Sequence, residues 1–167
     1  MLFYRLRQLL KAHNAKILPS EHTWAGHILS PSAQALFLRQ DTRDQRHALD
    51  VALALERNHA ALPAENLDLL LTAALLHDCG KSLQPVELWH RIFIVLAKFL
   101  PEGWRQALLR SATPLAFPLR LAQDHPAQGA RLARNAGLPD SVCLLIAEHH
   151  APSTALGQYL QAEDDRC

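Results

Sequence analysis

The segment TAALLHDCGK (72–81) combines the residue types most able to do chemistry in this chain of 167 residues. An apolar run ends there abruptly in His77, Asp78, Gly80 and Lys81. Consecutive side chains on a helix diverge by about 100°, so a neighbouring imidazole and carboxylate can bind a metal ion between them. We expect Gly80 to let the backbone turn and Lys81 to offer its ammonium to a phosphate. A purely structural interpretation is also open, in which Asp78 pairs with Lys81 at a helix end and His77 is a core histidine.

Further candidate ligands stand in other segments with helical apolar spacing. His47 lies in DQRHALDVALAL, His125 opens HPAQGARLARNAG, His149 is near the end of SVCLLIAEHH, and Asp164 lies in YLQAEDDRC. A metal site inside a helical bundle draws its ligands from several helices. The pattern therefore predicts a site with nitrogen and oxygen ligands contributed by separate helices.

The order of these residues resembles the HD superfamily of metal-dependent phosphohydrolases, over about residues 40–167. The resemblance implies that a first metal ion is bound by His47, His77, Asp78 and Asp164. His125 and His149 match the extra histidines of the binuclear subgroup and would bind a second ion, with Asp78 bridging the two. The catalytic residues would be Asp78, which orients or deprotonates the water, and Lys81, which holds a phosphate oxygen. Whether His150 is also a ligand, and whether Asp165 replaces Asp164, stays open.

The cofactors implied are divalent transition metal ions, two in the binuclear form. Histidine-rich ligation favours iron or manganese, with nickel, cobalt or zinc as alternatives, over magnesium. The function implied is hydrolysis of a nucleotide or other small phosphate ester, as a phosphomonoester, phosphodiester or phosphoanhydride. One alternative is a non-catalytic HD-fold module that binds a nucleotide or regulates a partner. Another is oxidation at mixed-valence iron, which no residue here singles out.

Departures from the sequence motifs of better characterised relatives narrow the range of expected substrates. The cyclic di-GMP phosphodiesterases of this superfamily follow their paired histidines with an acidic residue and a Gly-Tyr-Pro motif. Here His149-His150 is followed by Ala151-Pro152-Ser153, and Arg43 stands where some of those enzymes have a carboxylate. Cyclic di-GMP is therefore disfavoured. The chain looks more like small stand-alone HD proteins, including the HD-type diadenosine tetraphosphate hydrolases.

Composition predicts an all-α fold, a compact helical bundle of the HD-domain type. The chain has 33 Leu and 26 Ala against 14 Val, Ile and Thr together, which favours helix over strand. Its length suits one domain, with residues 1–40 as a helical extension packed on an HD domain at 41–167. The spacing of apolar, proline and capping residues predicts helices over 2–13, 20–28, 31–40, 42–58, 64–77, 84–99, 102–111, 116–122, 126–136, 139–149 and 153–164.

Residues 84–118 form an insertion between the His-Asp doublet and His125. They carry the cluster Trp89-His90-Arg91 just after Lys81, followed by an apolar helix. We expect this insertion to shape the substrate pocket as a lid. The alternative is a helix that only covers the core.

Charge and cysteine content set the broad class of protein. The formal net charge is +1 and there are three cysteines without metal-binding spacing, so we expect neither DNA or RNA binding nor a disulfide scaffold. No apolar run reaches the roughly 18 residues of a membrane span. We expect a cytoplasmic protein whose partner is a small nucleotide or phosphate-ester substrate.

Overall fold

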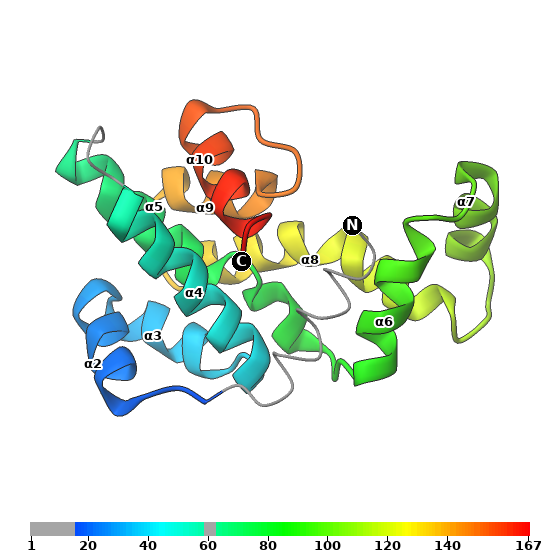
Figure 1. The fold of residues 1–167 in the computed structure, drawn as a ribbon, viewed down its shortest axis with the longest axis horizontal. Coiled ribbons are helices and arrows are strands. Elements are labelled where there is room, and N and C mark those ends of the chain that lie inside the picture. The colour runs from blue at the N-terminus through cyan, green and yellow to red at the C-terminus, as the bar shows by residue number, and fades with distance from the viewer. Residues whose placement is uncertain (1–15, 59–62) are drawn as a thin grey trace.

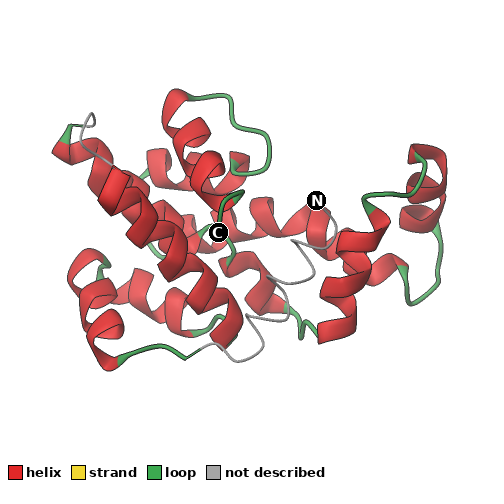
Figure 2. Ribbon diagram, viewed as in Figure 1, coloured by secondary structure: helices red, strands yellow, loops and turns green. Residues whose placement is uncertain are grey.

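The computed structural model describes residues 16–58 and 63–167, and its regular structure there is entirely helical (Figure 1). The elements are α2 (Pro19–Ile28), α3 (Pro31–Leu38), α4 (Thr42–Asn58), α5 (Ala64–Leu76), the 3-10 helix η1 (Cys79–Leu83), α6 (Leu88–Ala97), α7 (Glu102–Arg110), α8 (Ala116–Asn135), α9 (Asp140–Glu148) and α10 (Ala155–Asp164). Figure 2 shows no strand among the described residues, which confirms the predicted all-α fold. The predicted helix over 2–13 lies outside the described residues.

Helix α5 is the centre of the core. Leu70, Ala73, Leu75 and Leu76 are fully buried, and α5 packs against α4 and α9 as well as α2, α3 and α10. A helix that is apolar on most of its sides needs neighbours around it, and each fully buried leucine contributes about 2 kcal/mol. Because α5 runs through the middle of the bundle, the polar residues that follow its C-terminal end lie in the protein interior.

Helix α8 continues through Pro126, where the sequence analysis expected two helices. Proline lacks the N–H that would bond to the carbonyl of Ala122, and it typically costs about 3 kcal/mol inside a helix. Packing of α8 against η1, α6, α7 and α9 outweighs that local preference. The interpretation of Pro126 as a helix start was therefore wrong. As a result, His125 lies within a continuous helix rather than at the beginning of one.

Gly80 and Gly129 let η1 pack directly on α8. A Cβ atom on Gly80 would lie 2.1 Å from the carbonyl oxygen of His125 and 2.7 Å from the amide nitrogen of Gly129. The φ angle of Gly80 is not positive, so the backbone turn there does not require glycine. The expectation that Gly80 serves the turn was wrong, because its role is this close approach. The contact holds the backbone next to Asp78 against the helix that carries His125.

Helices α6 and α7 lie at one end of the molecule and pack on α8 (Figure 1). Helix α6 begins at Leu88, four residues later than the predicted residue 84. Glu87, just before the helix, and His90, in its first turn, form a capping box. Helix α7 has no buried residue, and Phe99 and Trp104 are 63% and 68% exposed. We call α6, α7 and the connection between them (residues 88–110) the arm.

Among the helices of the described residues, none combines the length and the apolar character needed to cross a bilayer.

Candidate metal centre

The end of α5 places His77 and Asp78 in the protein interior. His77 is the C-cap residue of α5 and keeps helical backbone angles, and Asp78 follows at the start of η1. Both residues are almost completely buried, at 1% and 3% exposure. A buried carboxylate requires compensating charge or hydrogen bonds, so its neighbours define the site.

Three buried histidines share one hydrogen-bonding pattern. The Nδ1 atom of His77 lies 2.8 Å from the carbonyl oxygen of Ala74, and that of His149 lies 2.8 Å from the carbonyl oxygen of Ile146. His125 makes the equivalent contact with Leu121 at 3.1 Å. A carbonyl only accepts, so each Nδ1 is the protonated nitrogen and each Nε2 presents a lone pair when the ring is neutral. Such a backbone contact fixes the orientation and tautomer of a metal-ligating histidine.

The Nε2 atoms of His77, His125 and His149 surround Asp78. They lie 3.6, 3.2 and 4.0 Å from its carboxylate oxygens. All three Nε2 atoms are buried and make no hydrogen bond within the described chain. Leaving a buried polar atom unpaired costs about 1–3 kcal/mol, and lone pairs that face a carboxylate repel it. A positive charge between these atoms, as a proton or a metal ion, removes both penalties, and the donor set therefore fits a transition metal ion.

His47 and Asp164 complete one side of the cluster. The Nε2 atom of His47, on α4, lies 2.7 Å from Oδ1 of Asp164, at the end of α10. The same oxygen lies 3.6 Å from Nε2 of His77. The available ligand atoms of His47, His77 and Asp78 all lie within 4.8 Å of one another. The structure thus brings together the four residues of the first expected ligand set.

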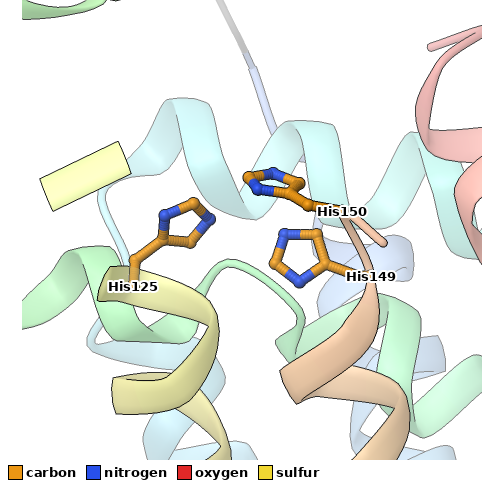
Figure 3. Close-up of side chains that lie close together, drawn as sticks. All are labelled: His125, His149 and His150. Atoms are coloured by element: carbon orange, nitrogen blue, oxygen red, sulfur yellow. The ribbon is translucent and has the colours of Figure 1, made fainter. Parts of the chain in front are cut away.

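A second group of possible ligands comes from α8 and the end of α9. His125, His149 and His150 offer ring nitrogens that lie within 4.8 Å of one another, and Figure 3 shows the three rings gathered in one place. His125 and His149 are buried, whereas His150 is exposed. Asp78 contacts His77 of the first group and His125 of the second, which is the position that a bridging carboxylate requires.

The electrostatics of the cluster favour ionised carboxylates. Burial raises the pKa of the Asp78 carboxyl, but the charges of Lys81 and His77 outweigh burial and hold this pKa well below its usual range. The pKa of Asp164 is likewise lowered, because its hydrogen bond with His47 and the positive charge of His77 outweigh burial. Both side chains are therefore anionic at neutral pH, as metal ligands must be.

The histidines differ in their protonation. Burial lowers the pKa of His77, but the carboxylates of Asp78 and Asp164 outweigh burial and raise this pKa to about 9. Burial and the positive charge of His77 lower the pKa of His149 to about 3. In the metal-free protein at pH 7, His77 thus carries a proton while His149 is neutral and ready to act as a ligand.

Lys81 lies between the cluster and a surface pocket. Its Nζ atom donates to Oδ2 of Asp78 at 2.6 Å, and its side chain also lines a pocket of about 420 Å³. The carboxylates of Asp78 and Asp44 outweigh burial and raise the pKa of Lys81. The side chain therefore stays an ammonium that can donate to an anion in the pocket as well as to Asp78.

The insertion contributes to the site differently from the expected lid. The pocket is lined by residues 84–87, whereas Trp89, His90 and Arg91 are absent from its lining. Trp89 is exposed, and His90 is buried and accepts the backbone N–H of Glu87 through Nδ1. Arg91 instead donates to both carboxylate oxygens of Asp44, at 2.7 Å each, and so ties the arm to the beginning of α4.

Glu148 is a positioning residue that the sequence analysis did not single out. It is buried and accepts hydrogen bonds from the backbone N–H and the hydroxyl of Ser153, as well as from the hydroxyl of Thr154. Thr154 in turn caps α10, the helix that ends in Asp164. Glu148 therefore fixes the connection from the histidines of α9 to the aspartate of α10. A carboxylate immediately before two histidines was the available signal.

Comparison with known families identifies the fold. The family model described as HD domain matches residues 45–166. The chain belongs to the HD-domain family. No curated protein and no solved structure matches it. The matched HD domain includes all the candidate ligands from His47 to Asp164 and also contains the arm.

Membership in the HD-domain family gives the cluster a chemical context. HD domains form a superfamily of metal-dependent phosphohydrolases, and its members generally bind divalent metal ions. The two groups of possible ligands in this chain agree with that property.

Proposed function

We propose that this HD-domain protein is a metal-dependent phosphohydrolase that acts on a nucleotide or other small phosphate ester through a binuclear centre. The observation that carries the proposal is the set of three buried Nε2 atoms, from His77, His125 and His149, that lack hydrogen bonds and surround the Asp78 carboxylate. Histidines needed only for packing would have their second nitrogen paired.

The ligands divide into two sets that share one carboxylate. His47, His77, Asp78 and Asp164 would hold one ion, and His125, His149 and Asp78 would hold the other. Iron or manganese suits these nitrogen and oxygen donors, and nickel, cobalt or zinc are alternatives. When bound, the ions would lower the pKa of water and neutralise the charge that develops on the phosphoryl group.

Asp78 and Lys81 would perform the remaining chemistry. Hydrolysis forms a bond from the water oxygen to phosphorus and breaks the bond from phosphorus to the leaving oxygen, which takes up a proton. Asp78 would orient the water and accept its proton, because its carboxylate is ionised and central in the cluster. Lys81 would donate to a phosphate oxygen from the edge of the pocket, where it remains positively charged.

A substrate panel tests the proposal. Protein loaded with manganese or iron is assayed against cyclic di-GMP, diadenosine tetraphosphate and nucleoside mono- to triphosphates at matched concentration. We expect turnover of a linear nucleotide to exceed that of cyclic di-GMP. K81A should reduce kcat/KM by about tenfold or more without releasing metal, because a protonated lysine is not a ligand. K98A, on the arm, is the matched control and should leave kcat/KM unchanged.

Two outcomes of the substrate panel would contradict the proposal. Fastest cleavage of cyclic di-GMP would overturn the substrate order. Absence of turnover of every phosphate compound, with metal bound, would replace the enzyme by a binding module.

A further inference from the structure

The pocket beside the metal centre is built from segments outside the expected ligand set. It lies between the end of α3, the beginning of α4, η1 and residues 84–87, and its volume is about 420 Å³. Its charged lining residues are Arg39, Asp41, Arg43, Asp44, Lys81 and Glu87. Lys81 belongs to both the pocket and the cluster, because its Nζ atom contacts Asp78. A ligand group in this pocket would thus lie next to a group bound at the metal centre.

The three carboxylates of the pocket are already engaged. Asp44 accepts two hydrogen bonds from Arg91, whose guanidinium does not line the pocket. Asp41 accepts the backbone N–H of Arg43 at 2.7 Å, and Glu87 caps the first turn of α6. These contacts reduce the negative charge that a ligand in the pocket would meet.

The cations of the pocket are less fully compensated. Arg39 is exposed, and no carboxylate in the described part of the chain forms an ion pair with it. The Nε atom of Arg43 lies 3.7 Å from Oδ1 of Asp41, and the Nη1 atom of Arg43 is buried without a hydrogen-bond partner among the described residues. Two arginines and one lysine therefore line one pocket, and guanidinium and ammonium groups are the side-chain donors that bind phosphate oxygens.

We propose that Arg39 and Arg43 form an anion subsite that holds a second phosphate group of the substrate, next to the phosphate that is hydrolysed. This inference rests on the proposed function, because it takes the cluster around Asp78 as the place of hydrolysis. It narrows the substrate class to compounds with at least two phosphate groups, such as nucleoside di- and triphosphates. Lys81 lies between the two positions and can donate to either phosphate.

Anion binding by the metal-free protein tests the subsite without any assay of activity. The probes are inorganic tripolyphosphate and orthophosphate, titrated by calorimetry at low ionic strength. Chelator-treated protein is used because tripolyphosphate itself binds metal ions. We expect the wild type to bind tripolyphosphate more tightly than orthophosphate, since only the longer anion reaches both positions.

Charge-matched variants locate the binding. R39A/R43A should weaken tripolyphosphate binding by about tenfold, because each lost guanidinium removes a charged hydrogen-bond donor. R57A removes the same type of charge from the other end of α4, about 20 Å away along the helix, and should change binding less than twofold. If R39A/R43A does not fold, R39Q serves in its place, because Arg39 is exposed and its replacement should leave the fold intact. R39Q should weaken tripolyphosphate binding about threefold.

Two results would overturn the subsite. One is a wild type that does not bind tripolyphosphate, and the other is an R39Q or R39A/R43A protein that binds it as R57A does. Failure of the proposed function is a different result, because arginine-dependent binding would persist in a protein that hydrolyses no phosphate compound. Conversely, a protein that hydrolyses monophosphates but binds tripolyphosphate independently of these arginines would retain the function and lose the subsite.

Discussion

The metal centre and the arm depart from the usual distribution of polar and apolar groups in opposite directions. The centre buries His77 and Asp78 after the end of α5, His125 within α8 and His149 after the end of α9. The arm leaves large apolar side chains such as Phe99 and Trp104 exposed. Packing from α4, α5, α8, α9 and α10 fixes the centre, whereas the arm packs mainly on α8. We therefore expect changes in the centre to be costly and comparable changes in the arm to be tolerated.

The largest difference between the two regions, in bound metal, should come from replacing both His77 and Asp78. H77A/D78A should reduce bound metal from at least one equivalent to near zero, because the cluster loses a ligand from one set and the shared carboxylate. Helicity measured by circular dichroism should remain largely intact, since the helices are held by apolar packing. The matched change in the arm, W104A, should leave metal content unchanged. Unaltered metal content in H77A/D78A would mean that the doublet only caps a helix.

Two glycines offer the next comparison. G80A should destabilise the protein by about 2–4 kcal/mol, because its Cβ would lie 2.1 Å from the backbone oxygen of His125. G103A, in α7, meets no atom within 4 Å and should change stability by less than about 1 kcal/mol, in the stabilising direction. Urea denaturation of both variants measures the difference. Equal stabilities would show that η1 does not pack on α8 as described.

The ion pair of Arg91 with Asp44, which links the two regions, should contribute less to stability than the Gly80 contact. R91A removes the two hydrogen bonds to the Asp44 carboxylate, which is 5% exposed, and should cost about 2 kcal/mol. R105A breaks the exposed ion pair with Glu102 within the arm and should have no measurable effect. Thermal unfolding of the two variants under identical conditions distinguishes them. A null effect of R91A would indicate that the arm is held by α8 alone.

Metal affinity should depend on pH through His77. The pKa of His77 is about 9 in the metal-free protein, so binding of an ion below that pH must displace one proton. We expect affinity to rise by about tenfold per pH unit between pH 6 and 8, and calorimetry in buffers of different ionisation enthalpy to detect the released proton. The metal-free protein should also lose stability as pH rises through about 9. The carboxylates of Asp78 and Asp164 stabilise only the protonated form of His77, which is lost in that pH range. In H77A the released proton should disappear.

Particular residues show what the sequence could predict. His77 and Asp78 were identifiable because polar neighbours at the end of an apolar run are conspicuous, and the all-α fold followed from the excess of leucine and alanine. The prediction of a helix start at Pro126 was wrong because packing of α8 outweighs the preference of proline for the first turn of a helix. The role of Gly80 was assigned to a turn because the approach of η1 to α8 is a tertiary contact. Arg39 went unnoticed for the same reason, since only the fold brings the end of α3 beside Lys81.

The metal content of the wild-type protein tests the central claim most directly. The full chain is purified without chelator, reconstituted with manganese or iron under reducing conditions, freed of unbound ions and subjected to elemental analysis. The geometry around Asp78 predicts at least one equivalent of transition metal per chain, rising to two when both ligand sets are filled. A value near zero after reconstitution would contradict the account.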